Sequence, residues 1–528
     1  MYKNKSYLIF LFLIIALAAF LRFWRLDQIP PSLWPDEAIN ANTAVRILET
    51  KNWQVFYPEN QGREGLFFLL ISFSFALFGI SIWSFKFIPA LAGILTILGQ
   101  YLFSKELCCH LKLDEKKSSL ISLLASFFLA ISFWHINFSR LGFRVILMPL
   151  VLIFSFYFLL HGLRTKKIYH FILAGFIFGL GFYTYTTFRL AVLLLGFFLI
   201  FWLLIAWKEK WLKRYIVAVL FLLIVTALTA APIGLYFLEH PQDFISRATG
   251  VSVFSQKNPF LSFLKSLGAH LIMFNLRGDL NWRHNFSGFP QLSPLAGVFF
   301  LIGLIWMLNQ FIHLLKLKGK NTTHWIKISG LLFGFAWFAS LLLPSCLTIE
   351  GVPHALRSMG VVPIVYFWSG LGAEFAYRWA KNKWQKPEKD YSKKIKIISS
   401  LVLIIMASFS FIFYFIIWAH QPALTDAFTQ RFTDVGNELN ALPPTIKKYV
   451  IQNEGDLPTE VPRFIQHSQG RNETIYLWPR DIEKIEFSAG DYIFIMNKNL
   501  EDLMPIINKY PNGQLYEKER ILFYKIIQ

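Results

Sequence analysis

Cysteine and charged residues are scarce in this chain of 528 residues. Its three cysteines, Cys108, Cys109 and Cys346, are too few and too badly spaced for a disulfide framework or a zinc site. Charged residues make up 16% of the chain, against about 25% in average soluble domains. The low charge therefore excludes an ordinary cytosolic enzyme. The three cysteines are expected to be buried or unreactive thiols.

Acidic residues are also fewer than basic ones, 32 against 52, which gives a formal net charge of +20. In a soluble protein such an excess would suggest a nucleic-acid partner. Here 55% of the residues are hydrophobic, and in an apolar chain a basic excess is typical of cytoplasmic loops between membrane spans. Residues 418–528 hold 12 basic and 15 acidic residues, so the positive charge belongs to the apolar part. We therefore expect no nucleic-acid partner.

Long apolar runs are abundant. A membrane-spanning helix needs roughly 20 mostly apolar residues. The sequence contains about eleven such segments: 7–24, 84–103, 119–136, 143–161, 169–187, 188–206, 215–237, 294–315, 326–345, 359–377 and 397–417. The first follows Lys3 and Lys5 and lacks a clear cleavage site, so we expect a retained anchor rather than a signal peptide.

Basic residues predict which side of the membrane each connection faces. The N-terminus and the connections 104–118, 162–168, 207–214, 316–327 and 378–396 hold 25 of the 40 basic residues that precede residue 418, which places them in the cytoplasm. Residues 65–103 must then cross the membrane an odd number of times. A single crossing by 84–103 satisfies this requirement and leaves 65–82 as a re-entrant or interfacial segment on the outer side. The sequence thus predicts a mainly α, polytopic membrane protein whose N-terminus is cytoplasmic and whose C-terminus is outside.

The tail differs from the rest of the chain. Short apolar runs at 449–452, 474–478, 492–496 and 521–527 predict strands, and residues 461–467 and 500–509 follow a helical pattern. We therefore expect two domains, a transmembrane module at 1–417 and a small extracytoplasmic α/β domain at 418–528. The tail has no catalytic motif of its own.

Polar residues that could carry chemistry gather on the predicted outer side. The strongest local signal is Trp34-Pro35-Asp36-Glu37-Ala38, in the first outer loop. A proline followed by two carboxylates also makes a good helix start, since carboxylates favour the positive end of the helix dipole. For Asp36 the functional interpretation is stronger, because a carboxylate in a loop walled by Trp34 and Trp53 could act as a base or bind a metal.

Six further motifs follow this acidic pair in order. They are Gln61-Gly62-Arg63-Glu64-Gly65-Leu66, Phe85-Lys86-Phe87-Ile88-Pro89-Ala90-Leu91-Ala92-Gly93, Phe138-Ser139-Arg140-Leu141-Gly142-Phe143-Arg144, Gly179-Leu180-Gly181-Phe182-Tyr183-Thr184-Tyr185, Gly278-Asp279-Leu280-Asn281-Trp282-Arg283-His284-Asn285 and Pro353-His354-Ala355-Leu356-Arg357-Ser358-Met359-Gly360. Together they resemble the membrane glycosyltransferases of the GT-C superfamily. The resemblance is closest to family 39, which includes protein O-mannosyltransferases and the bacterial aminoarabinose transferases that act on lipid A, and it spans most of residues 1–417.

The resemblance implies transfer of a sugar from a polyprenyl-phosphate carrier to an acceptor on the external face. It makes Asp36 the catalytic base, with Glu37 supporting it or orienting the acceptor. Arg63 and Glu64 of the second motif would contact the sugar or the acceptor. One departure is Gly65, where many relatives have proline.

A departing lipid phosphate needs cationic groups that stabilise its negative charge, and the planar fork of arginine can bind two phosphate oxygens. Arg140 and Arg144 would share one face if the chain is helical there. His354 and Arg357 open the span that begins near Met359, and a helix N-terminus is itself an anion site. We predict these four as carrier-phosphate ligands. Alternatively, Arg140 and Arg144 could extend to lipid headgroups at the end of a span. His354 and Arg357 could instead be a hydrogen-bonded pair at the membrane interface that binds no ligand.

Other polar and aromatic residues of the outer loops are candidates for sugar or acceptor contacts. These are Tyr183, Tyr185, Asp279, Arg283, His284 and Asn285. The two tyrosines are also typical of an interfacial aromatic belt, and the loop residues of a hydrogen-bonded scaffold. No metal-ligand spacing appears, so the sequence assigns no metal ligand and no certain cofactor, although a divalent cation stays open.

The sequence therefore predicts an inverting glycosyltransferase of a bacterial plasma membrane. Its expected partners are membrane lipid, a polyprenyl-phosphate sugar donor and an envelope glycan, lipid or protein acceptor. The alternative is a transporter or flippase of lipid-linked glycans, which would show interrupted spans in two repeated halves. Charges at one surface and the lack of an internal repeat favour the enzyme, and the lack of a phosphate-cradling P-loop argues against a nucleotide-driven pump.

Overall fold

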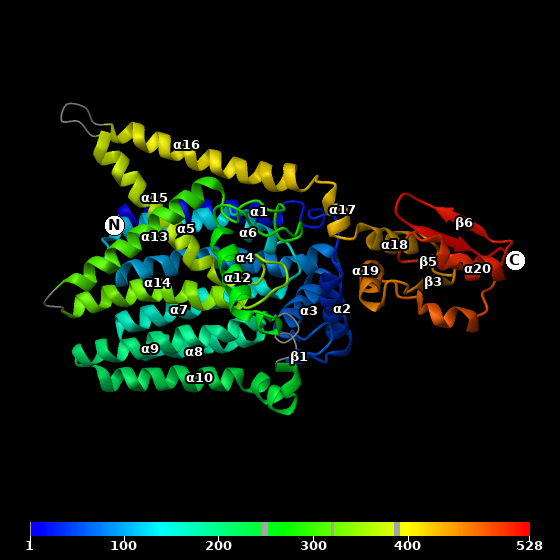
Figure 1. Ribbon diagram of the computed structural model, residues 1–528, viewed down its shortest axis with the longest axis horizontal. Helices are drawn as coiled ribbons and strands as arrows, with labels where there is room; N and C mark the ends of the chain where they lie inside the picture. The colour runs from blue at the N-terminus through cyan, green and yellow to red at the C-terminus, as the bar shows by residue number, and fades with distance from the viewer. Residues whose placement is uncertain (1, 245–251, 318–320, 385–390, 528) are drawn as a thin grey trace.

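The computed structural model describes residues 2–244, 252–317, 321–384 and 391–527. Parts of the predicted connections 316–327 and 378–396, and of the long segment between the predicted spans 215–237 and 294–315, lie outside the described residues. Most of the chain forms a bundle of helices that run side by side, and a small unit of strands and short helices projects from one end (Figure 1). We refer to this end as the tail end of the bundle.

Nine helices in the described ranges are long and apolar enough to cross a membrane, which confirms the predicted multi-pass architecture. They are α1 (Tyr2–Phe23), α4 (Ile82–His110), η1 with α7 (Arg144–Ile146 and Leu147–Thr165), η3 with α9 (Thr186–Leu190 and Ala191–Lys208), α10 (Leu212–Glu239), α13 (Pro294–Lys316), α14 (Thr322–Cys346), η5 with α15 (Met359–Val361 and Val362–Trp384), and α16 with the π-helical η6 (Ser392–Phe411 and Ile412–Trp418).

The two remaining predicted spans, 119–136 and 169–187, are shorter helices. They are α5 (Glu115–Ala130) and α8 (Ile168–Leu180), the latter continued by the short η2 (Gly181–Tyr183). The α5 helix ends early because Ser132 caps a separate helix, α6 (Phe133–Phe138), by accepting the His135 N–H. Both shorter helices still lie within the bundle, α5 against α4 and α15, and α8 against α7 and α10.

At the tail end, α2 (Pro35–Thr50) and α3 (Leu66–Phe78) pack against each other (Figure 1). The apolar α3 has 13 residues, which makes it too short to span a membrane and fits the re-entrant or interfacial segment expected at 65–82. A two-stranded hairpin of β1 (Phe56–Tyr57) and β2 (Arg63–Glu64) connects the two helices. Helix α12 (Pro259–Ile272) and the 3-10 turn η4 (Val253–Ser255) lie in the long segment before α13.

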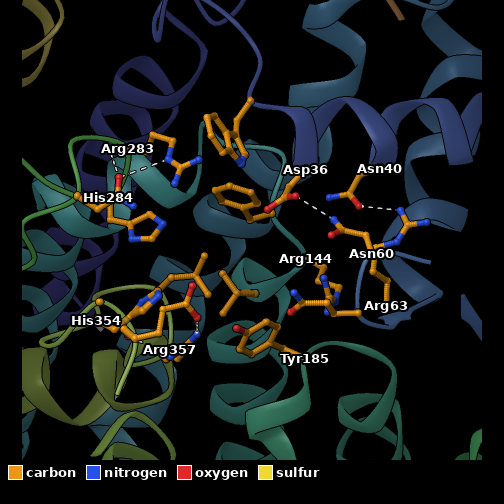
Figure 2. A pocket seen from close by; sticks show the side chains of 18 of the residues that line it. Asp36, Asn40, Asn60, Arg63, Arg144, Tyr185, Arg283, His284, His354 and Arg357 are labelled. Atoms are coloured by element: carbon orange, nitrogen blue, oxygen red, sulfur yellow. Dashed lines mark hydrogen bonds and ion pairs between the residues drawn. The ribbon is translucent and has the colours of Figure 1, made fainter. Parts of the chain in front are cut away.

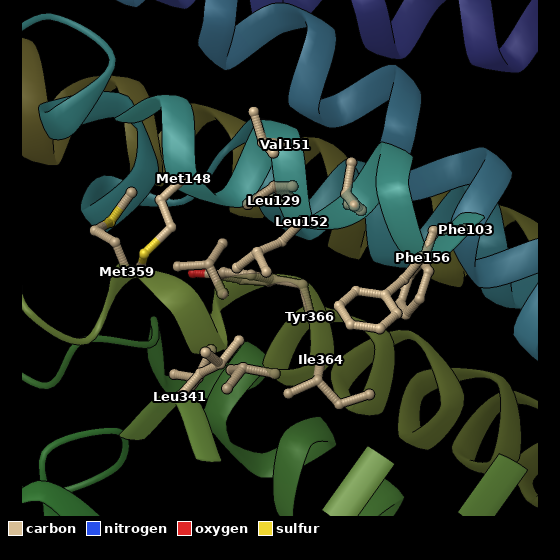
Figure 3. Close-up of a cluster of buried hydrophobic side chains, with 14 of the residues drawn as sticks. Phe103, Leu129, Met148, Val151, Leu152, Phe156, Leu341, Met359, Ile364 and Tyr366 are labelled. Atoms are coloured by element: carbon tan, nitrogen blue, oxygen red, sulfur yellow. The ribbon is translucent and has the colours of Figure 1, made fainter. Parts of the chain in front are cut away.

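The bundle core is aromatic and aliphatic. Figure 3 shows side chains from α4, α5, α7, α14 and α15 interlocking around Tyr366. The Phe156 ring lies 5.0 Å from the ring of Trp337, and that of Phe103 lies 5.2 Å from it, all buried. Such contacts hold the helices by van der Waals packing, which is the principal attraction available between helices in a lipid environment.

The tail forms a five-stranded sheet in the order β4-β3-β5-β7-β6. Its strands are β3 (Lys448–Ile451), β4 (Ile475–Leu477), β5 (Tyr492–Ile495), β6 (Gln514–Glu517) and β7 (Leu522–Lys525). Strand β3 runs parallel to both β4 and β5. Strand β7 runs antiparallel to both β5 and β6. The surrounding helices are α17 (Ala423–Ala427), α18 (Gln430–Ala441), α19 (Asp456–His467), η7 (Pro479–Lys484), η8 (Leu500–Leu503) and α20 (Met504–Lys509). All four predicted strands and both predicted helices are present. The sequence missed α18 and the edge strand β6, whose side chains are mostly exposed.

The tail docks on α2 through α19. Asn42 of α2 donates to the backbone and the side chain of Glu460, at 2.9 and 2.7 Å. The Phe464 ring lies 6.0 Å from that of Phe75 and 5.8 Å from that of Phe85. Ala38 of α2 belongs to the same buried cluster as the tail residues Val461 and Ile465 and several others. The tail is therefore packed onto the helix that carries Asp36. The boundary at residue 417 stays a prediction.

The crossing of α13 and α15 provides a test of the packing. A Cβ on Gly303 would overlap the carbonyl of Trp368, and a Cβ on Gly372 that of Phe299. We therefore expect Gly303→Ala to lower the free energy of unfolding by about 2 kcal/mol, because small residues allow this close approach. The measurement is the thermal midpoint in detergent. Gly196→Ala on α9, where a Cβ meets nothing within 4 Å, is the matched control and should leave the midpoint equal or slightly higher.

Candidate active site

A cavity of about 420 Å³ lies at the tail end of the bundle. Its wall combines the start of α2, the β1–β2 hairpin, the start of η1, the 281–284 loop, the 350–357 turn and one residue of α19 (Figure 2). The lining residues are Trp34, Asp36, Asn40, Asn60, Gln61, Arg63, Phe143, Arg144, Val145, Tyr185, Asn281, Arg283, His284, Glu350, Gly351, His354, Leu356, Arg357 and Leu457. Eight of the predicted site residues are among them.

Asp36 lies in the first turn of α2 and is half-buried in the cavity wall. Its Oδ1 accepts a hydrogen bond from Nδ2 of Asn60, at 2.9 Å. Asn60 belongs to a tight turn between the hairpin strands, where Asn60, Gln61 and Gly62 all have positive φ. The turn therefore places an amide donor against the carboxylate and fixes its orientation toward the cavity.

Arg283 lies across the cavity from Asn60, as Figure 2 shows. Its Cζ lies 3.5 Å from the centroid of the Trp34 ring, and its Nε donates to Oδ1 of Asn281 at 3.3 Å. Its buried Nη1 has no hydrogen-bond partner among the described residues. Burial lowers the pKa of the guanidinium, and the nearby Asp36 opposes this shift. A rigidly stacked arginine with a buried, unused N–H group is suited to receiving an anion.

Arg144 is held by Glu64. Its Nε donates to Oε2 of Glu64 at 2.6 Å and its Nη2 to the carbonyl of Gly62 at 3.1 Å. Burial alone would raise the pKa of Glu64, but the Arg144 guanidinium outweighs it and keeps the pKa below its usual range. Thr186 occupies the second carboxylate oxygen at 2.9 Å. Glu64 therefore acts as the anchor of Arg144 and does not line the cavity.

Arg63 connects two cavities. It lines the first one and also a neighbouring cavity of about 450 Å³ between α2 and α19. Its Nη1 donates to Asn40 Oδ1 at 3.1 Å and to Thr43 Oγ1 at 3.2 Å. Burial, together with the nearby Arg144, lowers the pKa of Arg63 to about 10. The second cavity is rich in charge of both signs, with Glu59, Arg46, Glu49, Asp456, Glu460 and Arg463 in its wall.

His354 and Arg357 lie in the turn before η5, at the entrance to the α15 span as expected. Arg357 Nη2 pairs with Oε2 of Glu350 at 2.7 Å. The His354 backbone N–H donates to Nε2 of His270 at 3.1 Å, and its ring lies 5.0 Å from that of His284. Both side chains line the cavity on the side opposite Asp36 (Figure 2).

Asp279, His284 and His354 form a group that could hold a metal ion, with candidate ligand atoms within 4.8 Å of one another. The sequence spacing did not indicate this group. Asp279 is buried, and its oxygens already accept from the backbone N–H groups of Asn281 and Ala355, both at 2.8 Å, and from His284 at 3.0 Å.

The structure does not place Arg140 in the cavity wall. The predicted shared face with Arg144 is absent, because α6 ends at Phe138 and the chain turns before η1 begins. The buried Arg140 guanidinium instead donates to five backbone carbonyls that precede α2: those of Leu21, Arg22, Trp24, Arg25 and Ile29. Its geometry is that of a clamp on this loop.

Three further predicted residues lie behind the wall. The buried Glu37 accepts hydrogen bonds from the backbone N–H groups of Gly142 and Trp34, at 2.7 and 3.1 Å. Burial raises the pKa of Glu37, although the nearby Lys86 ammonium acts to lower it. The Tyr183 hydroxyl donates to the carbonyl of Thr229, and Asn285 donates to the carbonyls of Asp279 and Phe289. Through these hydrogen bonds, all three residues hold the backbone behind the cavity wall.

Sequence reasoning missed Asn60, Asn40, Glu350 and Leu457. The composition of residues 58–62, Pro-Glu-Asn-Gln-Gly, is typical of a turn, but it does not indicate which side chain the turn faces. Leu457 could not be anticipated, because it reaches the cavity from the tail, some 420 residues after Asp36 in the chain.

The family described as dolichyl-phosphate-mannose-protein mannosyltransferase matches residues 66–233 of this chain. This match confirms the predicted resemblance to family 39 of the GT-C superfamily. No curated protein matches the sequence significantly.

Solved structures show the same fold over nearly the whole chain. ArnT from Cupriavidus metallidurans bound to undecaprenyl phosphate matches with a TM-score of 0.59 and 12% identity, over 98% of this chain and 97% of that one. The archaeal oligosaccharyltransferase AglB from Archaeoglobus fulgidus, in complex with an inhibitory peptide and a dolichol-phosphate, matches with a TM-score of 0.52 and 14% identity, over 100% and 75%. The chain is thus a multi-pass membrane protein with the fold of GT-C glycosyltransferases.

The clamp role of Arg140 can be separated from ligand binding. Arg140→Met should lower the free energy of unfolding by about 3 kcal/mol or more, because it leaves buried carbonyls without donors. Thermal denaturation in detergent measures the effect. Arg25→Met, at an exposed position of the same loop, is the control and should shift the midpoint little. Equal midpoints for the two variants would contradict the clamp.

Proposed function

We propose that this protein, which has the GT-C fold and a family 39 segment, transfers a sugar from a polyprenyl-phosphate-linked donor to an acceptor hydroxyl at the outer face of a bacterial plasma membrane. One observation carries the proposal: the Asp36 carboxylate faces a cavity that also holds Arg283, stacked on Trp34, and that has His354 and Arg357 on its opposite side. A base opposite several cations is what displacement of a lipid phosphate by a hydroxyl requires.

Asp36 is the proposed catalytic base. The hydrogen bond from Asn60 orients the carboxylate, and the acceptor hydroxyl would approach its other oxygen. The new glycosidic bond forms as the hydroxyl proton passes to Asp36, and the sugar–phosphate bond breaks with its electron pair leaving on the phosphate. Attack in line with the leaving group inverts the anomeric centre.

The departing phosphate would be bound by Arg283, Arg357 and His354, with Arg144 nearby. Arg283 has the unused Nη1, and Arg357 can exchange part of its pairing with the exposed Glu350 for a phosphate oxygen. Arg144 is fixed by Glu64, so its charge is preorganised and costs no reorientation. The carrier's lipid tail would lie between the spanning helices.

The acceptor would enter through the second cavity, between α2 and α19. Arg63 lines both cavities and separates the acceptor path from the sugar. The mixture of carboxylates and guanidinium groups in this cavity suits a polar acceptor with hydroxyl or charged groups. Arg63 is therefore proposed to orient the acceptor, which agrees with the role implied by the family resemblance.

The base is tested by Asp36→Asn in proteoliposomes with a polyprenyl-phosphate sugar. Transfer should fall by about a thousandfold or more, since amide nitrogen cannot accept the proton, whereas donor binding should persist. Asp27→Asn, at an exposed position before α2, is the matched control. Full transfer by Asp36→Asn would refute the assignment. Movement of the donor across the bilayer without release of its sugar would instead indicate a flippase.

The phosphate site is tested by Arg283→Gln. We expect kcat/KM for the donor to fall by about 100-fold, because a positioned donor to developing negative charge is lost. Arg277→Gln, on an exposed stretch of the same loop, should keep the wild-type value. Unchanged kinetics in Arg283→Gln would assign the phosphate to Arg357 and His354 alone.

A further inference from the structure

A separate cavity of about 210 Å³ lies at the end of the bundle opposite the tail. It is formed by the C-terminal ends of α4, α7 and α9 and the start of α14. The lining residues are Cys109, His110, Lys112, Leu163, Arg164, Lys166, Trp202, Glu209 and Ile326. The first cavity lies beside the N-terminal ends of α7 and α9, so the two are separated by the length of the helices (Figure 1).

Two buried polar atoms of this wall are unused. Trp202 Nε1 and His110 Nδ1 have no hydrogen-bond partner among the described residues, and both side chains are 2% exposed. Nε2 of His110 lies 3.0 Å from the carbonyl oxygen of Leu160 and therefore carries the ring proton, which leaves Nδ1 as an acceptor. The rings of His110 and Trp202 meet edge to face at 5.5 Å. The wall thus offers one donor and one acceptor side by side.

Basic side chains form the rim of this cavity. Arg164 pairs with Glu106 and Lys166 with Glu209, at 2.5 and 2.8 Å. Lys112, directly after α4, is exposed and has no ion pair in the part of the chain that the structure describes. The rim therefore keeps an uncompensated positive charge in the cavity that the buried Trp202 donor also lines. Buried polar groups normally have partners, so this arrangement calls for an anionic ligand that also carries a hydroxyl group.

The position of the cavity favours a lipid as the source of that ligand. It lies at the ends of spanning helices, where phospholipid headgroups meet a membrane protein, and basic pockets between spans bind such headgroups. On α9, directly after Trp202, the apolar side chains of Leu203 and Leu204 are exposed and could carry acyl chains.

We propose that this cavity binds the headgroup of an anionic glycerophospholipid with a free hydroxyl. Its phosphodiester oxygens accept hydrogen bonds from Trp202 Nε1 and the Lys112 ammonium, and its hydroxyl donates to His110 Nδ1. The site is distinct from the proposed transferase centre and does not depend on its activity. A lipid bound here would tie together the ends of α4, α7 and α9.

The test is native mass spectrometry of the full-length protein with phosphatidylglycerol, compared with phosphatidylcholine. The wild type should retain phosphatidylglycerol preferentially. Trp202→Phe removes the N–H group and keeps the ring, and should raise the dissociation constant by about five- to tenfold. Trp207→Phe, on the same helix and 65% exposed, is the matched control and should bind as the wild type does.

Two additional arms complete the test. Lys112→Gln, at an exposed position that leaves the core intact, should also weaken binding of phosphatidylglycerol several-fold. Soluble glycerol phosphate, added as a competitor, separates a headgroup site that needs the lipid from one that takes the free phosphate. Equal retention of both lipids, equal binding by Trp202→Phe and Trp207→Phe, or full displacement of the lipid by glycerol phosphate would overturn the proposal.

Discussion

Arg140 provides a constraint on which the candidate active site depends. An apolar bundle offers no water to the carbonyls of a chain that stops being helical, so such carbonyls must find donors within the protein. The chain leaves α1 at Phe23 and passes through an irregular loop before α2 begins at Pro35. One guanidinium satisfies two carbonyls in the last turn of α1, those of Leu21 and Arg22, and three carbonyls of this loop. The loop is thereby fixed, and α2 presents Asp36 at a defined place.

Buried groups also fix the position of other residues around the cavity. Glu64 neutralises and aims Arg144, Glu37 holds the N–H groups of two segments, and Asp279 connects a loop to the turn that carries His354. Each of these carboxylates is buried and pairs with another group of the protein. The cavity itself is left with a surplus of cations, whose mutual repulsion an anionic substrate would relieve.

The sequence predicted the class of fold because its signals are local. Span length and the placement of lysine and arginine depend on composition alone, and most predicted spans and tail strands are present. The role of Arg140 could not be predicted, since it depends on a turn between α6 and η1 that rotates Arg144 away from it. Asp36 was predicted because a carboxylate beside aromatic residues is unusual, and the structure places it in the cavity wall. Its partner Asn60 was missed, because nothing in a turn motif states which side chain the turn will face.

The docking of α19 on α2 has a consequence for the order of assembly. Leu457 completes the wall of a cavity that begins with residues of the first loop, yet it follows the last spanning segment in the chain. During synthesis the site stays open on one side until every span has been inserted and the tail has folded. A chain arrested before residue 457 would therefore lack one part of the wall of the cavity that Asp36 lines.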